Sequence, residues 1–285
     1  MKQLLVLSGK GGTGKTTVAS AFIKLSNAKA YADCDVDAPN LHLVTDHKSL
    51  VNDSPYFGMK KALIHQETCI ECGACDTHCR FDAIDSSNGY KVDSFSCEGC
   101  GVCAFVCPVG AIEMVSNIAG RISLYQNDAV FSTAKLEMGQ GNSGLLVTEV
   151  KKQLKPYGDT VDFAVIDGSP GIGCPVISSI SGVDTVLVVA EPTLSGISDM
   201  DRIVNTSRRF GVKIAVCINK YDVNIHNTKI IEAYCETNAL HFVGRIPYDA
   251  QAVKAINNGM TVVETPCPSG EAIKEIYHNV RSIMK

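Results

Sequence analysis

The sequence lacks a long hydrophobic run, a large excess of one charge and any long low-complexity tract. No stretch of its 285 residues approaches the roughly 18 apolar residues that a membrane helix needs, and the apolar start at Leu4–Leu7 is too short for a secretion signal. Lysine and arginine number 26, and aspartate and glutamate 30, a net charge of −4, which argues against nucleic-acid binding. We therefore expect a globular cytoplasmic protein without a membrane span.

Cysteine, by contrast, is abundant, with 13 residues in the chain. A reducing compartment does not keep disulfides, so thiols there are more often metal ligands or catalytic groups. Eight of these cysteines lie between Cys69 and Cys107. The composition therefore changes along the chain, which predicts a separate module in this region.

Residues 63–115 contain an internal duplication. Without these 53 residues the chain has 232, a normal size for one α/β domain. We therefore predict an α/β domain of residues 1–62 and 116–285, with a small α+β domain inserted at 63–115. A shift of 28 residues superimposes Cys69, Cys72, Cys75, Cys79, Ala83 and Ile84 on Cys97, Cys100, Cys103, Cys107, Ala111 and Ile112.

Outside the duplication, short β-branched runs alternate with segments of helical periodicity. Continuous apolar strands that alternate with helices indicate a parallel sheet covered on both faces. The alternating pattern of 121–137 predicts a hairpin on the sheet edge. Strands are predicted at 2–8, 29–32, 163–166, 185–190, 214–218 and 242–246, and helices at 16–25, 198–210, 228–237 and 272–284.

A phosphate-binding loop follows the first predicted strand. Residues 9–16 fit the pattern G-x-x-x-x-G-K-[ST] and stand directly before a predicted helix. Such glycines let backbone N–H groups face phosphate oxygens, while Lys15 reaches the β- and γ-phosphates and the Thr16 hydroxyl holds Mg²⁺. The alternative is a glycine-rich turn that binds nothing, but a bare turn requires neither the lysine nor the hydroxyl.

A second lysine, Lys10, makes this loop K-G-G-T-G-K-T-T. In this feature the sequence resembles the MinD/Mrp ATPases, with their deviant Walker A loop, a group that includes the nitrogenase iron protein. The resemblance implies a P-loop NTPase fold, ATP hydrolysis to ADP, and a nucleotide-sandwich homodimer in which Lys10 reaches the nucleotide of the partner subunit. The alternative for Lys10 is a solvated lysine on a loop.

The resemblance also implies the roles of residues further along the chain. Asp35 positions the attacking water, so Lys10, Lys15 and Asp35 form the catalytic set. Thr16, Asp33 and Asp167 hold Mg²⁺, although the segments 33–37 and 167–171 can also be read as helix caps or turns. The implied nucleotide contacts are Gly9, Lys10, Gly11, Gly12, Thr13, Gly14, Lys15, Thr16, Thr17, Asn219, Pro247 and Asp249.

The duplicated cysteines have the spacing of bacterial ferredoxins, C-x₂-C-x₂-C-x₃-C, twice. In that pattern the fourth cysteine ligates the cluster of the other half. The sequence therefore predicts two [4Fe–4S] clusters. Structural zinc is the competing interpretation, but zinc ribbons usually separate two C-x₂-C pairs by a longer loop. Cluster 1 would use Cys69, Cys72, Cys75 and Cys107, and cluster 2 would use Cys97, Cys100, Cys103 and Cys79.

Two features outside these motifs have more than one interpretation. Cys174 matches the offset of a cluster ligand in the nitrogenase iron protein, but the iron protein's other ligand has no counterpart here, so we expect a buried thiol. Cys34, Cys217 and Cys235 are expected to be buried as well. The apolar stripe of 272–284 is expected to pack against the sheet, the alternative being a membrane-binding helix as in MinD.

Because one chain carries both a nucleotide site and two redox centres, we expect the nucleotide state to be coupled to the redox centres. ATP-gated electron transfer to a partner protein is the leading hypothesis, as the iron-protein resemblance implies. Delivery of iron–sulfur or other metal clusters to a client is the alternative from the Mrp branch, and a glutamine-dependent amidoligase is a weaker one. Residues 63–115 hold eight acidic and two basic residues, which predicts a basic partner.

Overall fold

The computed structural model describes residues 1–45, 47 and 49–285, and the chain forms two compact units. The first unit comprises Met1–Asp53, Ile122–Ala134 and Gly144–Lys285, and the second comprises Ser54–Arg121 and Lys135–Ser143. The second unit therefore contains the whole duplicated segment, extends beyond it on both sides, and takes in a loop that follows much later in the sequence.

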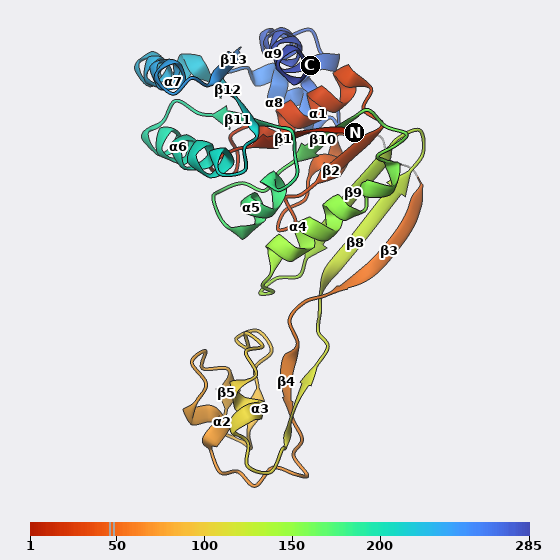
Figure 1. Ribbon diagram of the computed structural model, residues 1–285, viewed down its shortest axis with the longest axis vertical. Coiled ribbons are helices and arrows are strands. Elements are labelled where there is room, and N and C mark those ends of the chain that lie inside the picture. Colours follow the sequence, from red (N-terminus) through yellow and green to blue (C-terminus); the bar gives the residue numbers. More distant parts are fainter. Residues whose placement is uncertain (46, 48) are drawn as a thin grey trace. The chain divides into compact units, whose positions relative to one another are not determined.

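A nine-stranded sheet forms the centre of the first unit (Figure 1). Every neighbouring pair from β13 to β9 is parallel, as the alternation of apolar strands and helices predicts. Strands β9, β8 and β3 carry the chain between the units. In sheet order the strands are β13 (His241–Ile246), β12 (Lys213–Asn219), β11 (Thr185–Ala190), β1 (Lys2–Leu7), β10 (Phe163–Asp167), β2 (Ala30–Asp33), β9 (Val130–Leu136), β8 (Ile118–Gln126) and β3 (Leu50–Phe57).

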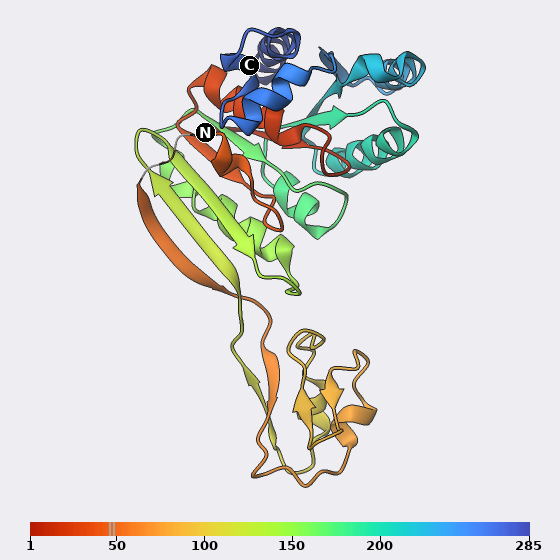
Figure 2. The same ribbon diagram turned by 180° about the vertical axis from the view of Figure 1, so that it is seen from behind.

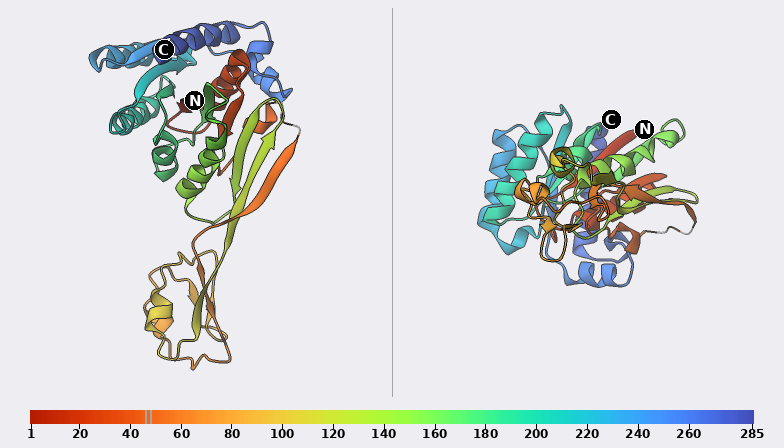
Figure 3. Two further views of the ribbon diagram at one scale, coloured as in Figure 1. Left: turned by 45° about the vertical axis from the view of Figure 1, so that its right-hand side comes forward. Right: turned by 90° about the horizontal axis from the view of Figure 1, so that it is seen from below.

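Helices cover both faces of this sheet, as Figures 1 and 3 show. On one face α1 (Lys15–Ser26), α8 (Ala250–Asn257) and α9 (Pro268–Met284) pack over a core that includes Leu4 and Val6 of β1. The other face carries α4 (Ser143–Lys152), α5 (Cys174–Ile180), α6 (Leu194–Arg208) and α7 (Ile225–Thr237). Short 3-10 helices are η1 (Leu41–Leu43), η2 (Lys155–Tyr157), η3 (Tyr221–Val223) and η4 (Val262–Glu264).

The sheet edge differs from the sequence prediction. Residues 121–137 do form a hairpin, β8 and β9, but β3 lies outside it and takes the edge (Figure 2). Six of the eight β3 residues are exposed and one is proline, so β3 has no apolar alternation that would reveal it. Helices α6 and α7 begin a few residues earlier than predicted, because Thr193 and Asn224 cap them with their side chains.

The second unit reflects the internal duplication. Its first half contains β4 (Lys61–Ile64), α2 (Ala74–Thr77) and β5 (Ile84–Asp85), and its second half contains β6 (Lys91–Val92), α3 (Val102–Val106) and β7 (Ile112–Val115). Each of its two small sheets combines one strand from each half, because β4 pairs with β7 and β5 pairs with β6, both antiparallel.

Throughout the described residues, no helix combines the length and the apolar character needed to cross a bilayer.

Candidate functional site

The phosphate loop joins β1 to α1 and ends in a left-handed glycine. Gly14 has φ +96° and stands at the N-terminus of α1, which no side chain caps. A Cβ atom on Gly14 would lie 2.3 Å from the amide nitrogen of Asn219, and that amide donates to the Thr13 carbonyl at 2.7 Å. Glycine is therefore required here by both backbone and space, and the first N–H groups of α1, which have no partner within the helix, are the type of donor that binds an anion.

A buried lysine and two carboxylates meet beside this loop. Lys15 Nζ lies 2.7 Å from Asp167 Oδ1 and 3.7 Å from Asp35 Oδ2, and Thr16 Oγ1 donates to Asp167 Oδ2 at 2.6 Å. Burial alone would lower the pKa of Lys15, but the charges of Asp167 and Asp35 outweigh burial and raise that pKa. The parallel strands β1 and β10 bring these groups together at their carboxyl ends.

Asp33 is fully buried at the end of β2, and its carboxylate binds backbone. Its Oδ1 accepts from Asp35 N at 3.0 Å, and its Oδ2 accepts from Asn40 N and Leu41 N, both at 2.9 Å. Burial and the nearby charge of Asp167 raise the pKa of Asp33 to about 7. Asp33 thus holds the loop that carries Asp35, as expected from its interpretation as a turn residue.

The second lysine of the loop has a carboxylate partner that the sequence did not reveal. Lys10 Nζ lies 3.2 Å from Glu191 Oε2, and Lys220 Nζ lies 2.6 Å from Glu191 Oε1. Burial opposes ionisation of Glu191, but the hydrogen bonds of Lys220 and Lys10 hold its pKa below the usual value. Glu191 directly follows β11, the neighbour of β1, and a carboxylate at that position is the signal that could have indicated it.

Several of the predicted nucleotide contacts lie along one cavity next to the loop. Gly12, Thr17, Asn219 and Pro247 line it together with Asp249. The Asp249 carboxylate, however, caps two helices. It accepts from Gln251 N at 2.8 Å and from Ser269 N at 3.2 Å, so Asp249 shapes this cavity from the helix ends.

The eight duplicated cysteines line two separate cavities of the second unit. One cavity is lined by Cys69, Cys72, Cys75 and Cys107, and the other by Cys79, Cys97, Cys100 and Cys103. Each cavity thus receives three cysteines from one half and the fourth from the other half. This is the crossed grouping that the ferredoxin spacing implies.

Backbone donors repeat around these cavities in the same way. Ala83 N donates to Cys79 Sγ at 3.4 Å, and Ala111 N donates to Cys107 Sγ at 3.2 Å. Among the described residues, no group of three or more His, Cys, Asp or Glu side chains is gathered tightly enough for one metal ion.

The remaining cysteines match expectation except at one position. Cys34, Cys217 and Cys235 are buried, as predicted, but Cys174 is exposed. The prediction of a buried Cys174 was wrong because it is the first residue of α5, and the buried side of that helix carries Val176, Ser179 and Ile180 instead. The packing of 272–284 is confirmed, since its apolar stripe is buried in the core formed with α1 and the sheet.

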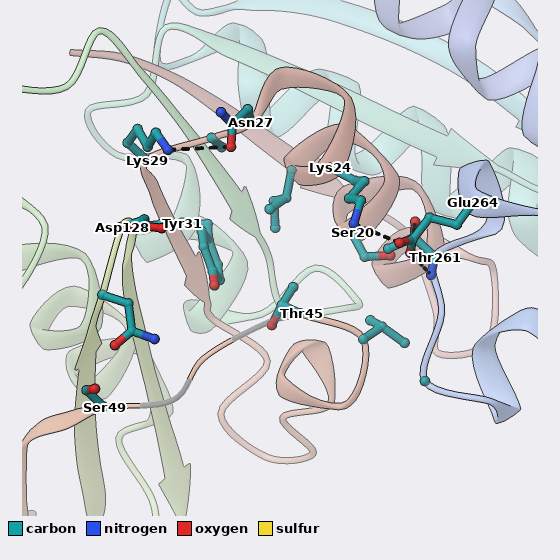
Figure 4. A pocket seen from close by; sticks show the side chains of 16 residues that line it. Ser20, Lys24, Asn27, Lys29, Tyr31, Thr45, Ser49, Asp128, Thr261 and Glu264 are labelled. Carbon is teal, nitrogen blue, oxygen red and sulfur yellow. Dashed lines mark hydrogen bonds and ion pairs between the residues drawn. The ribbon is translucent and has the colours of Figure 1, made fainter.

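Another cavity of the first unit contains none of these groups (Figure 4). Its described lining is mostly polar, and its charged groups include Lys24 and Glu264, which form an ion pair at 2.7 Å. The residues labelled in the close-up are Ser20, Lys24, Asn27, Lys29, Tyr31, Thr45, Ser49, Asp128, Thr261 and Glu264. The described lining offers neither a nucleophile beside a base nor an anion cradle.

Comparisons with known proteins agree with this site. Residues 4–262 match the CobQ/CobB/MinD/ParA nucleotide-binding domain family. An uncharacterised protein of Methanocaldococcus jannaschii, MJ0578, is 32% identical over 99% of this chain and 97% of its own length. The iron–sulfur cluster carrier protein of Pyrococcus abyssi is 25% identical over 99% of this chain and 86% of its own.

Solved structures show the same fold. MinD of Pyrococcus horikoshii, solved as a complex with Mg-ADP, superimposes with a TM-score of 0.58 at 19% identity, over 100% of this chain and 98% of that one. The phosphate loop at 9–16 and the aspartate-containing segments 33–37 and 167–171 lie within the matched family region. The chain therefore belongs to the CobQ/CobB/MinD/ParA family of P-loop ATPases.

Proposed function

We propose that this chain is a magnesium-dependent ATPase that works with two [4Fe–4S] clusters and acts as a nucleotide-sandwich homodimer. The observation that carries the proposal is the presence, in one chain, of the Lys15, Thr16 and Asp167 cluster and of two cavities with four cysteines each. The cavities have thiol donors in the crossed ferredoxin grouping, so the residues present suit such clusters.

The phosphate site suits hydrolysis of ATP. Lys15 exchanges its bond with Asp167 for the β- and γ-phosphates, and Thr16 and Asp167 hold Mg²⁺, which neutralises phosphate charge. Asp33 supports this magnesium site by fixing the following loop. Asp35, 3.7 Å from Lys15, orients the attacking water, and Lys10 leaves Glu191 to reach the nucleotide of the partner subunit.

Delivery of iron–sulfur clusters to a client protein is the function that the relatives favour. The Pyrococcus abyssi relative, which covers nearly the whole chain, is named a cluster carrier, whereas electron transfer rests on the sequence motif. In a carrier, the two nucleotide states would differ in affinity for the client. The hydrolysis step then separates the chain from the protein that has received the cluster.

Electron transfer is the second candidate, and one feature of the structure favours it. Each cavity draws cysteines from both halves of the second unit, so a cluster bound there would join the two halves. Release of such a cluster would cost the unit part of its stability. A resident redox centre does not incur that cost.

Transfer of labelled iron separates the two candidates. The chain is loaded anaerobically with ⁵⁷Fe clusters and incubated with ATP and apo-aconitase, a protein that needs a [4Fe–4S] cluster. A carrier gives ATP-dependent appearance of ⁵⁷Fe and activity in aconitase, whereas an electron-transfer protein keeps its iron through repeated reduction and oxidation. Loading without any cluster formation would contradict both candidates.

A further inference from the structure

The two halves of the second unit share one strand register, so that most residues have a counterpart 28 positions away. Ile64 of β4 lies opposite Ile112 of β7. Their counterparts, Val92 and Ile84, lie opposite each other in the other small sheet. The first cysteine of each half donates its backbone N–H to the carbonyl four residues earlier, at 3.0 Å in both halves. A difference in charge between counterparts is therefore a difference between the two cluster sites.

Lys61, at the start of β4, is a buried lysine beside the cavity of cluster 2. Its side chain is 8% exposed, and its amine donates to the Cys97 carbonyl. Cys97 and Ala62, the residue after Lys61, both line that cavity. Of the described Asp, Glu, Lys and Arg residues in the second unit, Lys61 alone is buried. Its charge is therefore the one least screened by water and salt.

The counterpart of Lys61 in the other half is Gly89, which has no side chain to place beside cluster 1. A Cβ atom on Gly89 would lie 3.3 Å from Gln66 Oε1 and 4.0 Å from Glu71 Oε1. Gln66 in turn donates to the Tyr90 carbonyl at 2.7 Å. At cluster 1 a neutral amide and a carboxylate thus lie where cluster 2 has a buried cation.

The exposed charges close to the cysteines nearly balance between the two sites. Each turn after the first cysteine carries one exposed carboxylate, Glu71 in the first half and Glu98 in the second. The turn after the fourth cysteine carries Arg80 and Asp82 in the first half and no charge in the second. Because the charges of Arg80 and Asp82 cancel, these turns leave the difference at Lys61 in place.

Two further carboxylates are divided between the sites. Asp76 directly follows the third cysteine of the first half, and Asp93 lies four residues before the first cysteine of the second half. The hydrogen bond of Ser96 and, to a smaller extent, the charge of Lys61 lower the pKa of Asp93. Asp93 is exposed, so solvent screens its charge more than that of the buried amine.

We propose that Lys61 gives cluster 2 the higher reduction potential, so that the first electron to enter the second unit resides on cluster 2. The electron comes from a low-potential one-electron donor, which is oxidised as the cluster is reduced. A positive charge beside a cluster stabilises the added negative charge. This inference rests on the proposed function, because it requires both clusters, and it holds for electron transfer and for cluster delivery. It goes further by ordering the two clusters and naming the residue that orders them.

A potentiometric titration of the anaerobic chain tests the order, with titanium(III) citrate as the reductant and electron paramagnetic resonance as the readout. We expect cluster 2 to be reduced first, with at least a tenfold larger equilibrium constant, which is about 59 mV for a one-electron couple. Cys100→Ser should alter the signal that appears first, and Cys72→Ser the signal that appears second, because each changes one ligand of one cluster. Reduction of both clusters at one potential, or of cluster 1 first, overturns the inference.

Variants of Lys61 test the cause. Lys61→Met removes the charge, and Lys61→Gln removes it but keeps a donor for the Cys97 carbonyl. Both should lower the potential of cluster 2 and narrow the gap between the clusters, whereas Lys61→Arg should preserve the gap. Lys60→Met is the matched control, because Lys60 is exposed and its charge is screened. A gap that is unchanged in Lys61→Gln, or narrowed as much in Lys60→Met, contradicts the role of Lys61.

Iron content separates failure of this inference from failure of the proposed function. Each protein is assayed for iron and acid-labile sulfide before the titration, so that loss of a cluster is not counted as a shift in potential. If the unchanged chain holds no clusters, the proposed function fails. If it holds both clusters and their potentials are equal, only the ordering by Lys61 fails.

Discussion

In the first unit the phosphate loop rests on strands that are buried on both faces, with Leu4, Leu5, Val6 and Leu7 all fully enclosed. The second unit has a far smaller apolar core, formed by Ala62, Ile64, Cys75, Ala83, Ile84, Cys97 and Ile112. Two of these seven are proposed cluster ligands. The comparison indicates that the first unit holds the phosphate loop in place by its own packing. We infer that the fold of the second unit depends on a group bound by its cysteines, as proposed above.

Removal of the clusters should give the largest difference in stability between the two units. Anaerobic oxidation with a chelator should unfold the second unit and leave the first folded, because only the second lacks a sufficient apolar core. Hydrogen exchange should show loss of protection in 54–121 and little change in β1, β10 and β11. Nucleotide affinity should stay within about twofold. Full protection of 54–121 without clusters would contradict the comparison.

Within the first unit the largest effect is expected from Lys15. Lys15→Ala should weaken ATP binding about 100-fold, since charge-assisted bonds to phosphate amount to about 3 kcal/mol. Lys10→Ala is the matched control in the same loop, and it should keep binding but lose dimerisation and hydrolysis. Calorimetry and sedimentation with Mg-ATP check both variants. Equal loss of binding in the two variants would show that the lysines share one task.

The buried carboxylate of Asp33 should make the free energy of unfolding of the first unit depend on pH. Because the pKa of Asp33 is raised to about 7, the folded chain holds a proton that the unfolded chain has lost between about pH 4 and 7. Stability from this group is therefore fully present below pH 4 and lost as the pH rises through 7, at most about 1.4 kcal/mol per pH unit.

Urea unfolding without nucleotide at pH 5.5 and pH 7.5 checks this pH dependence. Asp33→Asn should flatten it relative to the unchanged chain, because the amide does not titrate in this range. The difference between the two proteins isolates Asp33 from other titrating groups. If the unfolding free energies of the two proteins differ by the same amount at pH 5.5 and pH 7.5, Asp33 is ionised at both pH values.

The smallest effect is expected at Glu191. Glu191→Gln removes the charge that holds Lys10 within its own subunit, so hydrolysis should rise about two- to fivefold, in keeping with the modest energy of a partly exposed ion pair. Steady-state ATPase assays check this rise. The double variant Glu191→Gln with Lys10→Ala should show no gain, and a gain there would mean that Glu191 acts by another route.

Much of the first unit could be predicted from sequence because its signals are local. The phosphate loop, the parallel strands and the burial of 272–284 each depend on patterns within about ten residues. Glu191 and strand β3 were missed, since a lone carboxylate and an exposed strand carry no periodic signal. Cys174 was misplaced because burial of a helix start depends on which side of the helix faces the core.

In the second unit the cysteine spacing could be predicted from the sequence, but the packing around it could not. Its cysteine grouping could be predicted from spacing, and the two cavities have that grouping. The membership of residues 135–143 in this unit could not be predicted, because they follow β9 in the sequence and come close to Phe95 only in the fold. Long-range packing of that kind leaves no pattern in a single sequence.

The presence of clusters in the second unit is the central claim, and elemental analysis tests it most directly. Protein purified without oxygen from iron-replete cells is assayed for iron, acid-labile sulfide and zinc. The account predicts about eight iron and eight sulfide ions per chain. Stoichiometric zinc without sulfide would contradict it and leave the second unit as a zinc-stabilised appendage of an ATPase.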